Sequence, residues 1–483
     1  MAGIVGLGSA NKETVLRKAL AKIAHRGGAG SSVRSINGAT LGQVWPVAQE
    51  DFAISLGRHS VTLDGEIHNW TRLATGSACP LEALERAYSA AGPGFVADLD
   101  GPFALAIAAP EGLFLARDLV GKSPLYYGKS QGRLCFASEL KALLGWANEI
   151  REFPPGHYCK PGEGLVEFAR LEKRPPLRLP PEEMARQLRQ FLVASVRKRI
   201  GKGDVGAWLS GGLDSATMTA LARRQVPRLH SFAVGLEGAP DLQYARIVAD
   251  FVGTKHHERI CTVEEMLAVL PQVIYHLESF DALLVRSSIT NFLVGRLAAE
   301  DVPAVLSGEG GDELFAGYAY LKELDIADLP DELIDITKRL HNTALQRVDR
   351  CSASHGLVAR TGFLDKDLVE YALGIPAEMK LRSNGARVEK WILRRAMEGL
   401  LPAEVLTRTK AKFWEGAGVG ELLAAHAEEK ISDAEFLRER NLPDGSALKT
   451  KEELFYYRIF EEHFGAALSP ALVGRTKETP SHS

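Results

Sequence analysis

The chain has 483 residues, and its 58 basic and 61 acidic side chains give a formal net charge of −3. This balance gives no sign of a nucleic-acid partner, and no apolar run reaches the ~20 residues that span a bilayer. Five scattered cysteines without a Cys-x-x-Cys pair indicate neither a zinc knuckle nor a disulfide framework. With no secretion signal at the start, we expect a cytoplasmic protein without membrane partners.

The first part of the chain is predicted to form many short strands, because apolar segments alternate with Gly, Asp and Pro. Helical patterns are few and fall near residues 12–25 and 80–92. We therefore expect antiparallel sheets with flanking helices. Examples of the predicted strands are residues 39–47, 52–67, 103–110, 112–118 and 123–128.

The rhythm changes after residues 172–181, a proline-rich stretch that we interpret as a linker. An amphipathic helix is predicted directly after it, and short apolar strands then alternate with helices, a pattern that is typical of βαβ units and a parallel sheet. From about Asp312 the chain is predicted to be mostly helical. The expected domains are residues 1–175 and 182–470, followed by a disordered tail at 471–483.

A phosphate-binding loop is predicted at residues 210–215, Ser-Gly-Gly-Leu-Asp-Ser, between an apolar strand and a helix. The glycines let the backbone approach an anion, and free N–H groups at the helix start point toward it. Asp214 repels phosphate, so its expected role is to hold Mg²⁺ against pyrophosphate. The alternative is a glycine-rich turn with a serine that caps the helix.

This loop resembles the pyrophosphate loop of N-type ATP pyrophosphatases. A second segment at 306–318, Leu-Ser-Gly-Glu-Gly-Gly-Asp-Glu-Leu-Phe-Ala-Gly-Tyr, is similar to the corresponding segment of class B asparagine synthetases. The resemblance implies that Asp312 is the second Mg²⁺ ligand and that Glu309 faces an acyl-adenylate and the incoming amine. It also implies that Lys410, in Arg-Thr-Lys-Ala-Lys-Phe, contacts the leaving pyrophosphate.

The resemblance extends over nearly the whole chain, through segments such as 230–236, 363–372 and 390–394. In the first part, residues 117–128 and 152–158 are similar to the glutaminase domain of the same family. The implied fold class is α/β plus α+β. An N-terminal Ntn-like αββα sandwich is expected before a parallel-sheet ATP-pyrophosphatase domain (adenine nucleotide α-hydrolase-like) with a helical C-terminal part.

The resemblance implies two sets of binding residues besides the Mg²⁺ ligands. Those for ATP and pyrophosphate are Leu209, Ser210, Gly211, Gly212, Asp214, Ser215, Val234, Ser307 and Gly308. Those for the carboxylic-acid substrate are Leu283, Leu284, Arg286 and Glu309.

The glutaminase pattern is broken at several positions. Class B enzymes begin Met-Cys-Gly-Ile, whereas this chain has Ala2, which offers no nucleophile. The arginine that holds the glutamine carboxylate is absent from residues 41–46, and the aspartate that holds the ammonium is Ala78. Asp64 replaces an asparagine. A deliberate Cys-to-Ala change would alter one position only, so we expect a retained scaffold without glutaminase activity, in which Cys79 is structural.

The synthetase pattern also departs from the family. Leu283 and Leu284 stand where threonines help to bind aspartate, and Val358 replaces a glutamate. Arg286 is retained and can pair with a carboxylate. Because leucine cannot satisfy a buried polar group, we do not expect aspartate to be the preferred acid. β-Lactam synthetases share this architecture and an inactive glutaminase domain.

The predicted function is an AMP- and pyrophosphate-forming carbon–nitrogen ligase that uses ATP and Mg²⁺. It adenylates a small carboxylic acid and transfers it to ammonia or another amine, without glutamine. The alternatives are intramolecular amide closure, as in β-lactam synthetases, or a catalytically silent regulatory homologue. A tRNA-modifying pyrophosphatase is disfavoured by the near-neutral charge. A homodimer is compatible with these features.

Overall fold

The computed structural model describes residues 2–46, 58–201, 204–384, 386–409, 417, 419 and 422–477. The chain divides into two compact units. Unit 1 contains residues 1–170, 353–357 and 460–473, and unit 2 contains residues 171–352, 358–459 and 474–483. Within the described ranges, no helix combines the length and the apolar character needed to cross a membrane.

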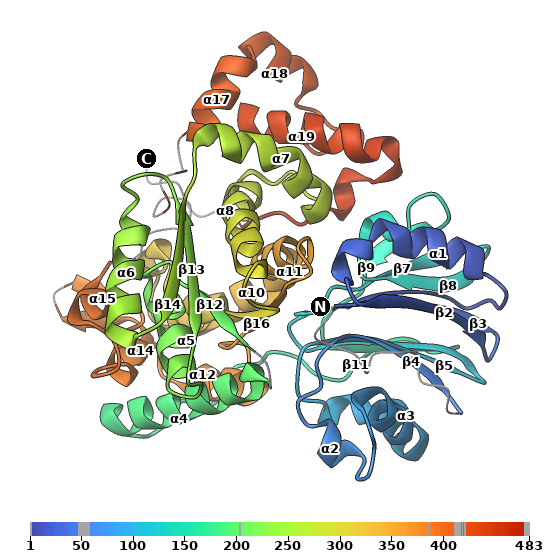
Figure 1. Ribbon diagram of the computed structural model, residues 1–483, viewed down its shortest axis with the longest axis horizontal. Helices are drawn as coiled ribbons and strands as arrows, with labels where there is room; N and C mark the ends of the chain where they lie inside the picture. The colour runs from blue at the N-terminus through green and yellow to red at the C-terminus, as the bar shows by residue number, and fades with distance from the viewer. Residues whose placement is uncertain are drawn as a thin grey trace. The chain divides into compact units, whose positions relative to one another are not determined.

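Unit 1 contains two antiparallel sheets (Figure 1). The six-stranded sheet has the order β2-β3-β1-β8-β7-β9, and the five-stranded sheet the order β11-β10-β6-β5-β4. The strands are β1 (Gly3–Leu7), β2 (Gly30–Ile36), β3 (Ala39–Trp45), β4 (Ser60–Gly65), β5 (Phe103–Ala109), β6 (Gly112–Arg117), β7 (Tyr126–Ser130), β8 (Arg133–Ala137), β9 (Asn148–Glu152), β10 (His157–Lys160) and β11 (Gly164–Glu167).

Helices cover the outer faces of the two sheets. Helix α1 (Glu13–Lys22) packs on the six-stranded sheet, and α2 (Trp70–Leu73) and α3 (Pro80–Ala91) lie beyond the five-stranded sheet (Figure 1). One apolar core fills the space between the sheets and includes Ile4 and Leu115, and a second joins α3 to β5. This arrangement confirms the predicted αββα sandwich. The predicted strand at 52–67 is described only in part, because residues 52–57 lie outside the described ranges.

Unit 2 is built around a five-stranded parallel sheet with the order β14-β13-β12-β15-β16. The chain moves outward from β12 to β14 and then returns to the other side of β12, so the strand order reverses between β12 and β15. In open α/β sheets, ligands bind at the carboxyl ends of the strands at such a point. The strands are β12 (Gly206–Trp208), β13 (His230–Gly235), β14 (Lys255–Ile260), β15 (Ala304–Ser307) and β16 (Val358–Thr361).

Helices make up most of the rest of unit 2, which confirms the predicted fold class for this part of the chain. A short hairpin is formed by β17 (Arg382–Asn384) and β18 (Ala386–Val388). The described helices that begin in unit 2 are α4 (Pro181–Ile200), α5 (Leu213–Arg223), α6 (Pro240–Val252), α7 (Val263–Leu277), α8 (Ala282–Ala299), α9 (Gly311–Phe315), α10 (Leu329–Lys338), α11 (Ala344–Ala353), α12 (Lys366–Gly374), α13 (Ala377–Lys380), α14 (Trp391–Ala396), α15 (Ala403–Thr407), α17 (Leu422–Lys430), α18 (Asp433–Glu439) and α19 (Lys451–Phe464).

The last described residues differ from the expected disordered tail. A 3-10 turn covers Pro470–Leu472, and residues 474–477 are held against unit 2 by hydrogen bonds and ion pairs. A polar composition predicts disorder only when the polar groups have no fixed partners. The predicted domain boundaries at 175 and 182 stay predictions.

A buried ion pair fixes α4 against α12 in unit 2. Arg199 Nη1 lies 2.9 Å from Asp365 Oδ2, and Lys198 Nζ lies 3.1 Å from the same carboxylate. Burial raises the pKa of Asp365, but the two cations outweigh it and lower the pKa to about 2. Because this value lies below the ordinary 3.8, the ionised pair stabilises the folded chain above pH ~4 and stops doing so as the pH falls toward ~2.

We predict that Asp365→Asn lowers the free energy of unfolding of unit 2 at pH 7 by at least about 2 kcal/mol. This is the free energy that corresponds to the lowered pKa of Asp365. The difference from wild type should shrink as the pH falls from ~4 to ~2. Urea unfolding across this range measures it. Asp367→Asn is the matched control, because its carboxylate also pairs with Lys198 but is exposed. Equal losses in the two variants would contradict the prediction.

Candidate active site

The predicted phosphate loop lies at the carboxyl end of β12 and opens into α5. Gly211 has φ +70°, and a Cβ there would lie 2.4 Å from Tyr244 Cβ, so only glycine fits. The loop is closed by its two serines: Ser210 N donates to Ser215 Oγ at 3.2 Å, and Ser215 Oγ donates to the Gly212 carbonyl at 3.0 Å. These bonds hold the backbone in a turn that leads into the helix start, as expected for an anion site.

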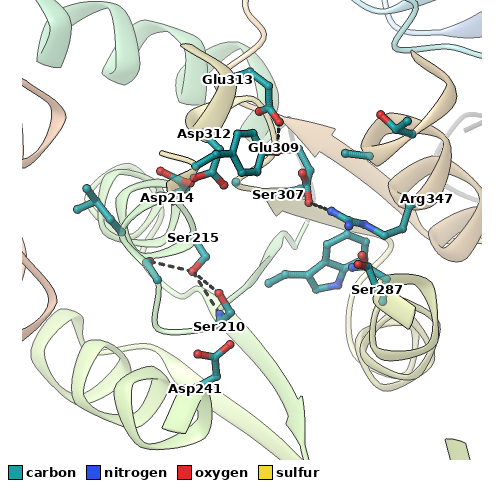
Figure 2. Close-up of a pocket in the computed structure, with 18 of the residues that line it drawn as sticks. Ser210, Asp214, Ser215, Asp241, Ser287, Ser307, Glu309, Asp312, Glu313 and Arg347 are labelled. Carbon is teal, nitrogen blue, oxygen red and sulfur yellow. Dashed lines mark hydrogen bonds and ion pairs between the residues drawn. The ribbon is translucent and has the colours of Figure 1, made fainter. Parts of the chain in front are cut away.

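The second predicted segment follows β15, the strand next to β12, and packs directly on the phosphate loop. A Cβ at Gly308 would lie 2.9 Å from Ser215 N, and a Cβ at Gly311 would lie 2.5 Å from Asp214 Cγ. Two loops more than 90 residues apart in the sequence therefore touch through glycine positions. This close approach brings the side chains of Asp214 and Asp312 together (Figure 2).

Both aspartates bind a single lysine. Lys390 Nζ lies 2.5 Å from Asp214 Oδ2 and 2.6 Å from Asp312 Oδ1, and the lysine is 2% exposed. Lys390 precedes α14 with φ +54°, a backbone conformation that non-glycine residues rarely adopt. A Cβ at Gly317 would lie 2.3 Å from Lys390 Cε, so this lysine also needs a glycine beside it.

A second group of charges lies beside this cluster. Arg347 Nη2, from α11, donates to Glu309 Oε1 at 2.5 Å (Figure 2). Tyr318 donates its hydroxyl hydrogen to the buried carboxylate of Glu313. Burial and the neighbouring Asp312 raise the pKa of Glu313 to about 7. Glu309 is thus ion-paired, whereas Glu313 lies in surroundings that disfavour its charged form.

These residues line one cavity of about 330 Å³ in unit 2. Most of the predicted site residues contribute to it, and the structure brings them together from strands and loops that are far apart in the sequence. They are Leu209, Ser210, Gly212, Asp214, Ser215, Val234, Leu283, Leu284, Ser307, Gly308, Glu309 and Asp312. Gly211 lies in the phosphate loop but does not line the cavity, and Lys410 lies outside the described residues.

Arg286 is not brought to the cavity. Its guanidinium binds the carboxylate of Glu452 through two nitrogens, Nε at 2.6 Å and also Nη2, and it is absent from the lining residues. Val358 is buried at the first position of β16 and does not line the cavity either. Spacing along the sequence could not reveal that Arg286 has an acidic partner on α19.

Several cavity residues were not singled out from the sequence. Lys390 belongs to the segment 390–394 that carried the resemblance, so its position before a helix was a usable signal. Arg408 opens the segment Arg-Thr-Lys-Ala-Lys-Phe that was quoted for Lys410, whereas Arg347 had no local signal. Arg408 Nη2 pairs with Asp241 Oδ1 at 2.5 Å, and both residues line the cavity.

Unit 1 holds a separate buried ion cluster where a glutaminase pocket was expected. Arg26 Nε donates to the Ala2 carbonyl at 2.8 Å, and the same guanidinium lies 3.0 Å from Asp64 and 2.9 Å from Glu139. Ser138 Oγ donates to Asp64 at 2.8 Å. The side chains of Arg26, Asp64 and Glu139 are fully buried. Ala2 therefore lies among fixed charges, with an inert methyl side chain.

Comparisons with known proteins match both parts of the chain. A family model described as Asparagine synthase matches residues 187–335 and 325–481, and one described as Glutamine amidotransferase domain matches residues 1–162. A glutamine phosphoribosylpyrophosphate amidotransferase structure from B. subtilis covers 49% of this chain and 67% of that chain at 17% identity, and its TM-score of 0.32 is too low to bear on the argument.

Curated relatives cover most of the chain. The chain is 36% identical over 457 residues to a probable glutamine-hydrolysing asparagine synthetase of Schizosaccharomyces pombe, across 84% of this chain and 82% of that protein. It is 35% identical over 441 residues to the glutamine-hydrolysing asparagine synthetase B of Escherichia coli, across 84% and 79%. The predicted resemblance to asparagine synthetases is confirmed, and so is the enzyme class, a carbon–nitrogen ligase that forms AMP and pyrophosphate. The chain belongs to the asparagine synthase family.

Proposed function

We propose that this protein joins a small carboxylic acid to ammonia or another amine in two steps, without using glutamine. In the first step an oxygen of the acid attacks the α-phosphorus of ATP, so that the α–β bond breaks, pyrophosphate leaves and acyl-AMP forms. In the second step the amine nitrogen attacks the acyl carbon, a proton is lost from nitrogen, and AMP leaves. Positioning and charge neutralisation would supply most of the rate enhancement.

The convergence of Asp214 and Asp312 on one cation carries this proposal. Two carboxylates from adjacent loops, with glycines where any Cβ would collide, form a built site for positive charge. Carboxylate oxygens are the ligands that Mg²⁺ prefers, and Mg²⁺ usually binds through one or two of them plus substrate phosphates. The residues therefore fit Mg²⁺, which would neutralise charge on the phosphates. Lys390 would supply a second positive charge beside the leaving pyrophosphate.

The remaining roles follow from position in the cavity. Ser210, Ser215 and Ser307 are proposed to bind phosphate, and Val234 to contact the adenine. We propose that Glu309 accepts the amine proton, and that Lys410 contacts pyrophosphate as the family pattern implies. Arg286 is not retained as a carboxylate ligand, because Glu452 already binds it.

Independence from glutamine rests on unit 1. The relatives named above are glutamine-hydrolysing, but here position 2 is alanine and Asp64 is bound by Arg26 and Ser138. Gln43, within the segment where the family has an arginine, is fully buried and accepts a hydrogen bond from Leu63 N at 3.3 Å. We propose that unit 1 is a retained scaffold and that ammonia or an amine enters unit 2 by another route.

Two alternatives remain as secondary proposals. An intramolecular amine would give ring closure, as in β-lactam synthetases, and the apolar Leu283 and Leu284 are compatible with such a substrate. The retained Asp214 and Asp312 favour an active enzyme over a silent regulatory homologue. A cytoplasmic location and a homodimer also stay proposals.

We predict that the purified protein converts ATP to AMP and pyrophosphate when a suitable acid and ammonium are present, and that Asp214→Asn and Asp312→Asn each lower the rate at least 100-fold. Each substitution removes one of the two carboxylates that bind Lys390 and that would bind Mg²⁺. Anion-exchange chromatography of the nucleotides measures the products, and circular dichroism confirms folding. Formation of ADP instead of AMP would show that the loop has been assigned to the wrong reaction.

We predict that Gly311→Ala impairs the same reaction at least tenfold without unfolding the protein, since its methyl group would lie 2.5 Å from Asp214 Cγ and displace that carboxylate. Gly94→Ala is the matched control, because nothing lies within 4 Å of a Cβ there. Pyrophosphate release is the readout for both. Wild-type activity in Gly311→Ala would mean that the contact between the two loops does not position Asp214.

We predict that glutamine supports turnover no better than the ammonium it contains as an impurity, and that no glutamate accumulates. Ala2→Cys alone should not restore glutamine hydrolysis, because Arg26 keeps Asp64 and the nearby backbone in fixed ion pairs and hydrogen bonds. Glutamate is measured with glutamate dehydrogenase. Glutamate release by the unmodified protein would refute the proposed scaffold role.

A further inference from the structure

Residues 474–477 form an ordered segment, here called the strap, that lies along unit 2 and reaches the cavity. Each of its residues has a specific neighbour. A Cβ at Gly474 would lie 2.5 Å from the Asn342 carbonyl oxygen, and Arg475 lies over the ring of Phe280 at 4.6 Å and pairs with Glu453. Thr476 and Lys477 line the cavity.

Thr476 fixes the α8 side of the cavity. Its N–H donates to Asp281 Oδ2 at 3.0 Å, and its hydroxyl donates to Asp281 Oδ1 at 2.7 Å. Asp281 is buried and also caps α8 by accepting a hydrogen bond from Leu284 N at 2.9 Å. The strap thus binds the residue that starts the helix carrying Leu283 and Leu284, the apolar part of the wall.

Lys477 fixes the part of the cavity wall next to α10. Its Nζ lies 2.8 Å from Glu332 and 2.7 Å from Asp335, both on α10. Glu332 also accepts a hydrogen bond from Tyr320 at 2.6 Å, and Asp335 binds Arg339 at 3.0 Å. Tyr320 and Arg339 line the cavity. Thr476 and Lys477 therefore each bind a carboxylate that in turn holds residues of the cavity wall.

The charges of the cavity wall are paired throughout the part of unit 2 that the structure describes. Every lysine and arginine that lines the cavity has a carboxylate partner. The pairs are Lys390 with Asp214 and Asp312, Arg347 with Glu309, Arg339 with Asp335, Arg394 with Glu389, Arg408 with Asp241, and Lys477 with Glu332. Because each of these charges is already compensated, a second substrate carboxylate would gain less from them than from an unpaired cation.

From these observations we propose that the strap closes the acyl end of the cavity and makes it selective for a monocarboxylic acid with an uncharged, partly apolar body. This inference rests on the proposed adenylation function. Leu283, Leu284 and Ile336 offer apolar contact to the body of the acid, and the charges around Lys477 are already compensated, which disfavours a second carboxylate. Thr476 and Lys477 act as positioning residues, through Asp281, Glu332 and Asp335.

Acid-dependent exchange of labelled pyrophosphate into ATP tests the proposal with two probes, 3-phenylpropanoate and L-aspartate. Wild type should show at least tenfold higher kcat/KM with 3-phenylpropanoate. Thr476→Val and Lys477→Met should each raise the KM for this acid roughly tenfold, as expected for one lost polar contact, and leave the KM for ATP within twofold. Lys430→Met, on the exposed end of α17, is the matched control and should change neither constant.

Hydrogen–deuterium exchange adds a readout that does not depend on substrate. Thr476→Val should increase exchange in the first turn of α8, and Lys477→Met should increase it in α10, with melting temperatures close to wild type. Preference of the wild type for L-aspartate would overturn the substrate class. Wild-type kinetics in both strap variants would overturn the role of the strap while the adenylation function stands. No exchange with either acid, or with acetate and hexanoate, would instead overturn the proposed function itself.

Discussion

The site in unit 2 depends on neutralising two carboxylates, those of Asp214 and Asp312, which the fold holds close together. Asp214 and Asp312 come from loops that pack glycine against backbone, so neither can move away without opening that contact. Two like charges at this separation and burial would repel strongly. Lys390 lies between them and neutralises both, held by a strained backbone and by the glycine beside its side chain. The proposed Mg²⁺–phosphate complex would bind beside these compensated charges.

The parallel sheet is what makes this convergence possible. Because β12 and β15 are neighbours, the loops that follow them leave the same edge of the sheet at adjacent positions. Helix α8 and the strap add apolar and polar walls to the same cavity. In unit 1 the buried charges are paired with one another around an alanine, which is the observation behind the proposed scaffold role.

The sequence was sufficient where short segments carry the chemistry. The glycine-rich loops, the sandwich and the parallel sheet followed from local patterns and a family resemblance. Contacts between distant segments could not be predicted in this way. Arg286 has the right chemistry for a carboxylate, but Glu452 on a distant helix binds it. Lys390, Arg347 and the strap residues gain their roles from partners 38–195 positions away. The polar composition of the last residues predicts disorder, because the sequence does not reveal the partners that residues 474–477 bind in unit 2.

Transfer of isotope from the acid to the nucleotide tests the central claim most directly. Acids labelled with ¹⁸O in the carboxylate, including 3-phenylpropanoate and L-aspartate, would be incubated with ATP, Mg²⁺, ammonium and the protein, and AMP analysed by mass spectrometry. Attack of the carboxylate on the α-phosphorus places one labelled oxygen in AMP when the acyl group is transferred, and this is the result that the account predicts. Label in orthophosphate, with ADP as the nucleotide product, would contradict it.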